Sequence, residues 1–482
     1  MFHLAAEAVQ AALDAGARYA DARALTARSQ TISARNGQIE DLDQTESSGV
    51  GVRALIGSSW GFFATAELTE RAARHAGELA ATTARSSHAA PGPPLALADA
   101  PVVSADWSTP VAEDPFAVPL DERCGLLVDV TAGLVAVPGV AQGVASLAFW
   151  DTDKHFVSSH GSRIHQRLVE SGGGMSATAV GDAETQVRSY PQSFGQFESG
   201  GYEVIRRFDL PGHVARVAEE AVALLTAPPC PAGVTTLILD GSQTALQIHE
   251  SVGHAVELDR ILGWEAAFAG TSFLELAELG RLRYGSPLMQ ITADATLPGA
   301  LGTFGFDDEG VPAQRVDIVR DGIWVGVLSG RDSAALAGVA PGGMVRADGF
   351  NRLPMVRMTN VGLLPGAGSL DDLVADTDDG VLMSTNRSWS IDDRRLNFQF
   401  GCEAAWEIKR GRRGRLLRNP TYTGITPQFW AGLDRVAGPA EWVHWGIPNC
   451  GKGQPMQSAH TAHSASPTRF RNVRIGVTGS GR

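Results

Sequence analysis

The segment from His249 to His254, with the sequence HESVGH, carries two imidazoles and a carboxylate beside the first of them. Neutral imidazole nitrogens are good ligands for Zn²⁺, and a glutamate next to such a ligand can take the proton of a metal-bound water. The common zinc peptidase motif, H-E-x-x-H, places its histidines four residues apart, whereas these are five apart. The segment predicts a metal-assisted hydrolase with an unusual ligand spacing.

This spacing requires a helix that departs from regular geometry. At roughly 100° per residue, side chains five positions apart on an α-helix point about 140° away from each other. A straight helix therefore cannot aim His249 and His254 at one ion. One inserted residue is accommodated by a π-bulge, which is frequent at functional sites, and Gly253 is where the backbone can loosen at low cost. We expect a distorted helix that carries two ligands and a base.

The flanking residues are typical of a buried helix that follows a strand. Residues 235–240 predict a short buried strand, and Ser242 is the expected N-cap of the helix. Apolar side chains recur along the segment at Ala245, Leu246, Ile248, Val252 and Val256. For this segment taken alone, two unrelated histidines on a buried helix remain the alternative interpretation.

A catalytic zinc takes three protein ligands and leaves one position for water, so a third ligand must come from elsewhere. Cys450 lies in a Pro/Gly-rich stretch that is expected to form a loop, and a thiolate is a good zinc ligand. Glu257 lies three residues after the second histidine and is expected on the same helical face. Further candidates are Cys402, in a predicted strand, and His460 and His463, in an expected loop. The residues alone leave Cys450 and Glu257 both open.

Several segments, in their order along the chain, resemble the TldD/PmbA family of metallopeptidases. HESVGH resembles the family's H-E-x-x-x-H signature. The other matching segments are Glu46 to Arg53 and Trp60 to Phe62 (N-terminal strands of the family), Leu301 to Gly310 (L-G-x-x-x-x-D-D-E-G), Arg357 to Asn360 (R-M-T-N) and Asn449 to Pro455 (the C-terminal C-G-K-x-G-Q loop). These matches are spread over nearly the whole chain, so their joint pattern is far more specific than any single motif.

The resemblance implies a zinc-dependent peptidase and names its site residues. In the family, the cysteine of the C-terminal loop is the third ligand, which implies that His249, His254 and Cys450 hold Zn²⁺. Glu250 is then the general base: it would take the proton of the metal-activated water and later pass it to the leaving nitrogen of the peptide. Leu258 stands where the family often has glycine, a departure that touches neither the ligands nor the base.

Two further residues are expected near the metal without binding it. With Cys450 as the third ligand, Glu257 becomes a carboxylate behind the ligands or in contact with substrate. His463 is a candidate for a similar role. His463 and His444 are also weak candidates for stabilising the oxyanion, a role that no motif assigns.

The resemblance also implies a substrate and a partner. Family members act on unstructured peptides, including peptide precursors, and often work as pairs in which one subunit lacks the metal motif. This chain has the full motif, so we expect the metal-bearing, TldD-like subunit of a dimer, either with itself or with such a homologue. An extended peptide is expected to bind by adding a strand to a sheet edge. The competing hypothesis is a non-catalytic peptide-binding or partner subunit with a structural zinc.

Composition excludes several other classes of protein. The chain has 482 residues, of which 44% are hydrophobic and 19% charged, as in a soluble enzyme with a sizeable core. Its net charge of 40 − 53 = −13 argues against nucleic acid or an anionic membrane as the main partner. Four cysteines make no disulfide framework. With no signal peptide and no apolar run of about 18 residues, the expected compartment is the cytoplasm.

Pattern changes along the chain predict an α+β protein with two domains. Residues 1–230 are expected to form an α/β domain, and residues 231–482 a strand-rich domain that carries the metal helix. The helices predicted before residue 230 span residues 2–17, 68–84, 120–135 and 211–225. Strands are expected over residues 20–65, with turns at 36–37 and 56–58, and over residues 140–197.

Four other segments also give expectations. Residues 86–100 predict a mobile loop. Residues 262–286 predict either a flexible flap over the cleft or an ordinary connection with a short helix. The basic run 409–415 is interpreted as a solvated hairpin tip. His155, His160 and His165 are interpreted as surface histidines on strands.

Overall fold

The computed structural model describes residues 1–87, 95–193 and 195–476, so much of the predicted mobile loop lies outside the described residues. The predicted fold class is confirmed: helices and strands are mixed, and the C-terminal half is rich in strands. Among the described residues, no helix is both long enough and apolar enough to cross a membrane.

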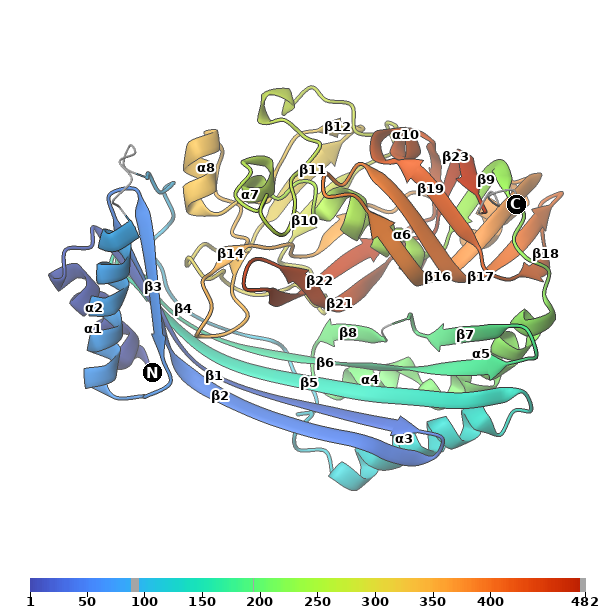
Figure 1. Ribbon diagram of the computed structural model, residues 1–482, viewed down its shortest axis with the longest axis horizontal. Helices are drawn as coiled ribbons and strands as arrows, with labels where there is room; N and C mark the ends of the chain where they lie inside the picture. The colour runs from blue at the N-terminus through green and yellow to red at the C-terminus, as the bar shows by residue number, and fades with distance from the viewer. Residues whose placement is uncertain (88–94, 194, 477–482) are drawn as a thin grey trace.

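An eight-stranded sheet forms the N-terminal half. Its strands are β1 (Tyr19–Arg35), β2 (Gln38–Ile56), β3 (Ser59–Thr65), β4 (Ser104–Ser108), β5 (Val140–Ser158), β6 (Arg163–Val180), β7 (Thr185–Tyr190) and β8 (Gln196–Ser199), and the helices of this half are α1 (Phe2–Asp14), α2 (Glu70–Ser87), α3 (Leu120–Val135), α4 (Glu203–Phe208) and α5 (Leu210–Thr226). The four longest strands bend into a trough, and the C-terminal half lies over its concave side (Figure 1).

Two-residue turns set the register of these strands, as the sequence predicts. Asn36 and Gly37 both have positive φ, at 51° and 79°, and join β1 to β2 so that Arg35 pairs with Gln38. An Asn-Gly pair tolerates this conformation, which matches the twist of a hairpin. The basic run 409–415 contains a turn of the same kind between β17 and β18, with positive φ at Arg410 and Gly411. The interpretation of that run as a hairpin tip is confirmed.

Several smaller sheets and a barrel form the C-terminal half. Its strands are β9 (Gly233–Leu239), β10 (Ile291–Asp294), β11 (Arg315–Arg320), β12 (Ile323–Trp324), β13 (Val345–Arg346), β14 (Met355–Val356), β15 (Val361–Leu363), β16 (Asp379–Ile391), β17 (Asn397–Lys409), β18 (Arg412–Leu417), β19 (Thr421–Ile425), β20 (Leu433–Val436), β21 (Val443–Lys452), β22 (Gln457–Ala465) and β23 (Thr468–Ile475). Its helical elements are α6 (Gly241–Ile248), the π-helix η1 (His249–Gly253), α7 (Leu258–Ile261), η2 (Leu276–Glu278), α8 (Arg331–Ala337), α9 (Leu370–Ala375), α10 (Thr426–Ala431) and η3 (Pro439–Glu441).

The barrel closes because β16 pairs with both β9 and β17, while β23 and β19 complete the ring between them. Helix α6 follows directly from β9 and is buried along its whole length. Every apolar residue of the predicted stripe, from Ala245 to Val256, is buried. The segment with the two histidines is therefore held on all sides by packed structure, which fixes where its side chains point.

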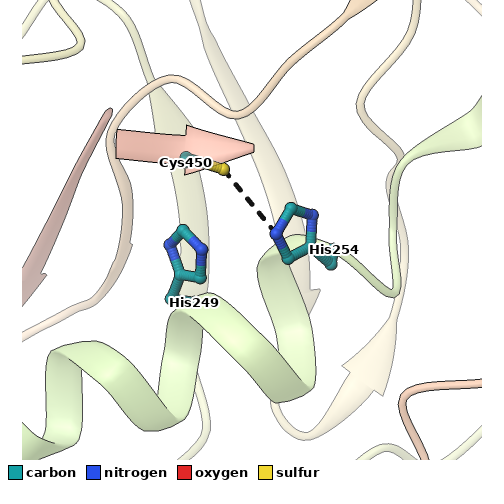
Figure 2. A group of neighbouring side chains, drawn as sticks. All are labelled: His249, His254 and Cys450. Carbon is teal, nitrogen blue, oxygen red and sulfur yellow. Dashed lines mark hydrogen bonds between the residues drawn. The ribbon is translucent and has the colours of Figure 1, made fainter. Parts of the chain in front are cut away.

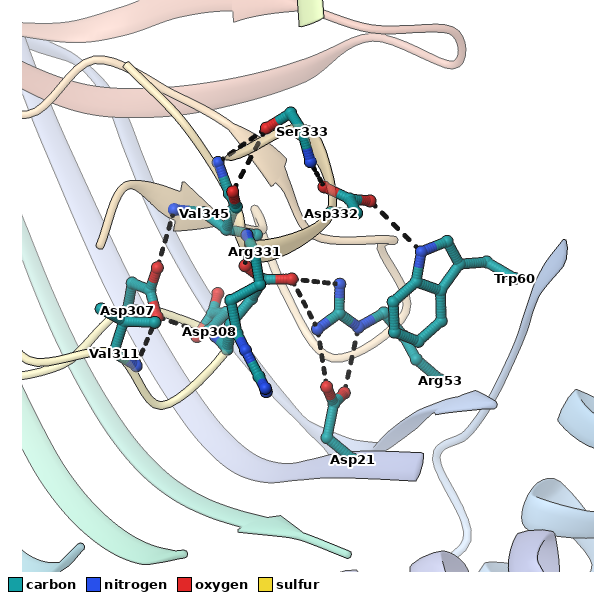
Figure 3. Close-up of polar contacts among 12 residues, drawn as sticks. Asp21, Arg53, Trp60, Asp307, Asp308, Val311, Arg331, Asp332, Ser333 and Val345 are labelled. Atoms are coloured by element: carbon teal, nitrogen blue, oxygen red, sulfur yellow. Dashed lines mark hydrogen bonds and ion pairs between the residues drawn. The ribbon is translucent and has the colours of Figure 1, made fainter. Parts of the chain in front are cut away.

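Buried ion pairs join the two halves of the chain (Figure 3). Arg53 on β2 contacts Asp21 at 2.6 Å and Glu309 of the C-terminal half at 3.3 Å. Glu309 also accepts the backbone N–H of Arg331 at 2.7 Å, and Trp60 donates to Asp332 at 3.2 Å. The acidic segment around Glu309 thus ties the trough to the C-terminal half and takes no part in the cleft with the histidines.

Residues 262–286 form a long connection rather than a flap over that cleft. Their backbone is tied down by hydrogen bonds from Thr271 N–H to Asp393 O (3.0 Å) and from Phe273 N–H to Arg394 O (2.8 Å). Their one short helical turn is η2 (Leu276–Glu278), close to the helix expected in the second interpretation. Within the described chain, none of the residues that line the cleft comes from this segment, which favours the ordinary connection over the flap.

Candidate metal centre

The helix with the two histidines begins at an aspartate. Asp240, at the end of β9, is the N-cap of α6, and its carboxylate accepts the backbone N–H of Gln243 at 2.8 Å. The expected cap, Ser242, instead donates its hydroxyl to the same carboxylate at 2.9 Å. The prediction of the cap was wrong by two residues, because a carboxylate at the end of a strand already reaches the free N–H groups of the first turn.

The predicted distortion of this helix is confirmed. Residues His249–Gly253 form a π-helix, and the N–H of His254 bonds to the carbonyl of His249, five residues back, at 3.2 Å. The hydroxyl of Tyr284 donates to the carbonyl of Ser251 at 2.5 Å. In a regular α-helix this carbonyl would accept a backbone N–H, so Tyr284 gives it a partner where the helix is distorted. The extra residue in the turn brings the two histidines onto one side of the helix.

Gly253 is required by packing rather than by its backbone angles. A Cβ atom there would lie 2.1 Å from the sulfur of Met358. The residue does not have positive φ. Gly253 therefore allows the distorted turn to approach the neighbouring chain closely, a reason that the sequence alone does not reveal.

Three potential ligands meet at this turn (Figure 2). Ligand atoms of His249, His254 and Cys450 all lie within 4.8 Å of one another, and the Sγ of Cys450 is 3.6 Å from the Nε2 of His254. All three side chains are buried. Two imidazoles and a thiolate form a donor set that suits Zn²⁺ better than Mg²⁺ or Mn²⁺, so these residues fit the predicted ion.

Cys450 reaches the histidines from a strand, not from a loop as predicted. It lies on β21, which pairs with β22, and the ladder skips a step between Ile447 and Cys450. That irregularity accommodates Pro448, which has no N–H to give to the ladder. The expected loop position of His460 and His463 is also wrong, because both lie on β22. Pro and Gly in this region mark a bulged hairpin.

His463 fixes which nitrogen of His249 is available. The Nδ1 of His463 lies 2.8 Å from the carbonyl of Val361, and its Nε2 lies 2.7 Å from the Nδ1 of His249. Because a carbonyl only accepts, His463 donates from Nδ1 and accepts at Nε2, and His249 must then donate from its Nδ1. The Nε2 of His249 is left with its lone pair, as a metal ligand requires.

Glu257 likewise fixes which nitrogen of His254 is available. Its Oε2 lies 2.9 Å from the Nδ1 of His254 and 2.8 Å from the Nε of Arg260. Burial alone would raise the pKa of Glu257, but Lys452, His254 and Arg260 outweigh it and hold the pKa well below its ordinary value. The carboxylate therefore accepts the proton of Nδ1 and leaves Nε2 to face Cys450. This geometry favours Cys450 over Glu257 as the third ligand.

The surroundings of Cys450 favour its thiolate. Burial would raise the pKa of the thiol, but the His254 ring, when it carries a proton on Nε2, and the Arg357 guanidinium stabilise the anion and lower the pKa to about 7. Arg357 also donates to the carbonyl oxygen of Cys450. By contrast, burial raises the pKa of Cys402 well above its ordinary value. Cys402 lies on β17, outside the group of potential ligands, so it is not the third ligand.

We expect metal affinity to fall steeply below pH 7 and to level off above about pH 8. With a pKa of about 7, Cys450 is already a thiolate above neutrality and gives up little proton when metal binds. Burial lowers the pKa of both His249 and His254, so the rings add no proton beyond the one that His254 shares with the thiol. Below pH 7, each pH unit should cost roughly tenfold in affinity.

Competition with a coloured chelator between about pH 6 and about pH 9 measures this profile. An affinity that keeps rising tenfold per unit from pH 7 to pH 9 would show a thiol with its ordinary pKa of 9.0 and contradict the prediction.

The three potential ligands line a cleft of about 390 Å³ between the two halves of the chain. Its walls come from the turn between β7 and β8, from α6 and η1, from the end of β16 and from β21. Glu250 lies in this cleft beside His249, and its Oε2 is 2.7 Å from the Nη1 of Arg395. The carboxylate expected to act as base thus has access to the space next to the ligands, with its orientation held by a guanidinium.

The other three histidines considered for the site already have hydrogen-bond partners. His460 pairs with Glu170 at 2.7 Å, and His444 with the hydroxyl of Ser464 at 2.7 Å. Neither lines the cleft, and both nitrogens of His463 already have partners. None of these three is therefore placed to stabilise an oxyanion.

His165, on a strand of the trough, is held between two carboxylates. Its Nδ1 lies 3.0 Å from Asp106 and its Nε2 2.8 Å from Asp153, which raise its pKa. His155 stacks on it, with the ring centroids 4.5 Å apart. A ring that donates from both nitrogens has no lone pair for a metal. These groups form a partly exposed ion-pair cluster, in line with the interpretation of surface histidines.

Sequence reasoning assigned no role to three polar groups at the site. Arg395 contacts Glu250, Asn386 lines the cleft, and the buried Lys452 bonds to Asp259 at 2.8 Å and to Glu257 at 3.2 Å. For Lys452 the available signals were its place in the Asn449 to Pro455 segment that resembles the family's loop and its spacing of two residues from Cys450.

The chain is similar to known proteins along most of its length. The chain matches three family domains: PmbA/TldA metallopeptidase domain 1 over residues 20–89, the central domain over 113–226 and the C-terminal domain over 232–476. A metalloprotease from Methanothermobacter thermautotrophicus is 29% identical over 95% of this chain and 96% of its own. A zinc metalloprotease TldD homolog from Saccharolobus solfataricus is 23% identical over 48% of this chain and 50% of its own.

A solved structure shares the fold along the full length. A putative modulator of DNA gyrase from Thermotoga maritima superposes with a TM-score of 0.76 at 16% identity, covering 98% of this chain and 99% of that one. At this identity the likeness concerns the fold alone.

Proposed function

The chain belongs to the PmbA/TldA family of metallopeptidases, and on that premise we propose that it is a zinc-dependent peptidase that hydrolyses unstructured peptides or peptide precursors. The observation that carries the proposal is the meeting of His249, His254 and Cys450 beside Glu250 in one cleft. In such a site the ligands, the base and the space for a substrate are all present.

Each side chain has a distinct part in the proposed reaction. His249, His254 and Cys450 would hold the ion, which when bound would supply Lewis acidity and lower the pKa of the attacking water. Glu250 takes a proton from the attacking water and gives it to the leaving nitrogen. Arg395 keeps the carboxylate of Glu250 turned toward the cleft through their 2.7 Å contact.

The preference for unstructured peptides follows from an open strand edge. One edge of β16 pairs with β9 over residues 380–383. Beyond Met383, none of the described strands pairs with this edge. The end of β16, including Ser390 and Ile391, lines the cleft. An extended peptide can add to this edge through main-chain hydrogen bonds, whereas a folded chain has already used those groups. We also propose a dimer, with itself or with a homologous subunit that lacks the metal motif.

The competing function is a non-catalytic peptide-binding or partner subunit with a structural zinc. A structural site is normally closed by a fourth protein ligand. Here the described residues supply three, and the site opens into a cleft that also contains a carboxylate. Both features favour the enzyme.

Removal of the metal tests the proposed function. The purified protein should hydrolyse an unstructured peptide, lose this activity when a chelator strips the metal, and regain it when about one equivalent of Zn²⁺ is returned. The same peptide cyclised into a stable hairpin should be cleaved poorly. Hydrolysis that survives complete removal of metal, or an absence of hydrolysis in the metal-loaded protein and in its complex with any co-encoded homologue, would contradict the proposal.

A further inference from the structure

Asn386 is an unusual residue in the wall of the cleft. Its side chain is only 6% exposed, and neither its Nδ2 nor its Oδ1 has a hydrogen-bond partner among the described residues. It nevertheless lines the same cleft as Glu250 and Cys450. Folded proteins rarely leave both ends of a buried amide unpaired, because each unpaired group loses its hydrogen bonds to water and gains nothing in return.

The backbone around Asn386 is shaped to hold it there. The preceding residue, Thr385, has a φ of +62°, an unfavourable conformation for a β-branched residue. The register between β16 and β17 then shifts between Asn386 and Ser388. Bulges of this kind turn a side chain toward a site, and strained residues cluster where function maintains them. Strain and an unpaired amide at one point both indicate a ligand that is bound only during function.

Three other polar side chains in the wall already have partners. Arg395 pairs with Glu250, Ser242 bonds to Asp240, and Gln192 donates to the carbonyl of Gly446 at 2.9 Å. Of this set, Asn386 alone has a free donor and a free acceptor side by side. It is a neutral group, so it is suited to a neutral partner of complementary shape rather than to a carboxylate or a phosphate.

We propose that Asn386 binds the main chain of the substrate, donating from Nδ2 to a peptide C=O and accepting at Oδ1 from a peptide N–H. This inference rests on the proposed function and adds a recognition residue to it. A primary amide offers one donor and one acceptor, which match the two polar groups of an extended residue. Every residue except proline offers both groups, so Asn386 recognises extended backbone and not sequence. A helix or a paired strand cannot satisfy it, because those groups are already bonded.

The first test compares the effect of one substitution at two buried asparagines. Asn386→Leu keeps the number and branching of the side-chain heavy atoms and removes both polar atoms. We expect it to leave the thermal midpoint unchanged or raised, because no bond within the protein is lost. Asn360 is a matched control, since its amide donates to Asp294 at 2.7 Å and to Thr303 at 2.9 Å. Asn360→Leu should lower the midpoint.

The second test measures recognition. For Asn386→Leu we expect KM to rise roughly tenfold, the loss of about two neutral hydrogen bonds, with kcat changed less than about threefold. Binding of an uncleaved peptide to the Glu250→Gln protein should weaken by the same factor when Asn386→Leu is added. This binding measurement does not depend on turnover, so it tests Asn386 even if the proposed hydrolysis is not found.

A scan of N-methylated peptides identifies the contact. Methylating one peptide nitrogen at a time removes one N–H, and one position should weaken binding to the parent protein but not to Asn386→Leu. The proposal is overturned if the methylation profile is identical in the two proteins. It is also overturned if Asn386→Leu lowers the thermal midpoint as Asn360→Leu does while peptide binding stays unchanged, since the amide would then serve the fold or a resident water.

Discussion

Replacing Glu250 with glutamine is expected to slow the hydrolysis of an unstructured peptide by roughly 10³-fold, with the metal and the fold retained. Glutamine has the size of glutamate and can still accept from Arg395, which lies 2.7 Å from the carboxylate. It cannot take a proton from water, so only the base is removed. Hydrolysis is followed by mass spectrometry of the products at saturating peptide, and metal by elemental analysis of the same sample.

Glu407 provides the matched control for this substitution. It lies on β17 and pairs with the exposed Arg415 at 3.2 Å, outside the cleft. Glu407→Gln should therefore leave hydrolysis unchanged. Glu250→Gln that kept the activity of the parent protein would exclude Glu250 as the base. If Glu250→Gln lost its metal as well, the carboxylate would be needed for the ion itself.

Cys450→Ala is expected to have the largest effect on the metal. It removes one of three ligands, so affinity should fall by more than the roughly 10–100-fold that follows the loss of a group that only orients a ligand. The change leaves His249 and His254 without the thiolate that lies 3.6 Å from the second ring. Hydrolysis should be lost together with the metal. Titration against a chelator of known affinity gives the dissociation constant for both proteins.

Cys402→Ala separates this effect from damage to the core. Cys402 is as buried as Cys450, also lies on a strand of the C-terminal half, and has its pKa raised by burial. The Cys402→Ala substitution should lower the stability of the fold slightly and leave the metal affinity unchanged. Undiminished affinity in Cys450→Ala would move the third ligand elsewhere and would make Glu257, now bonded to Nδ1 of His254, the next residue to test.

Local features of the fold are predictable from the sequence where short-range geometry decides them. The helix predicted over residues 120–135 matches α3 to the residue. The turn at Asn36 and Gly37 was predictable because two positive φ values suit that pair. The distortion of the metal helix followed from the spacing of His249 and His254, since no regular helix brings them together.

Glu257 and His463 were expected near the metal, but the contacts of the supporting groups could not be predicted because pairing over long distances in the chain decides them. His463 lies 214 residues from His249 and meets it only through the register of β21 with β22 and the position of Val361. The loop expected at Cys450 is a bulged strand, since its Pro and Gly residues also suit an irregular ladder. Asn386 has no motif at all: its significance lies in the absence of a partner, which only the folded chain reveals.

The central claim is that His249, His254 and Cys450 hold a metal and that Glu250 acts beside it as the base. Metal content and peptide hydrolysis, measured on the same preparations of the parent protein, Glu250→Gln and Cys450→Ala, test it most directly. The claim predicts metal with hydrolysis in the first, metal without hydrolysis in the second, and neither in the third. Full hydrolysis by metal-loaded Glu250→Gln, or by Cys450→Ala without metal, would contradict it.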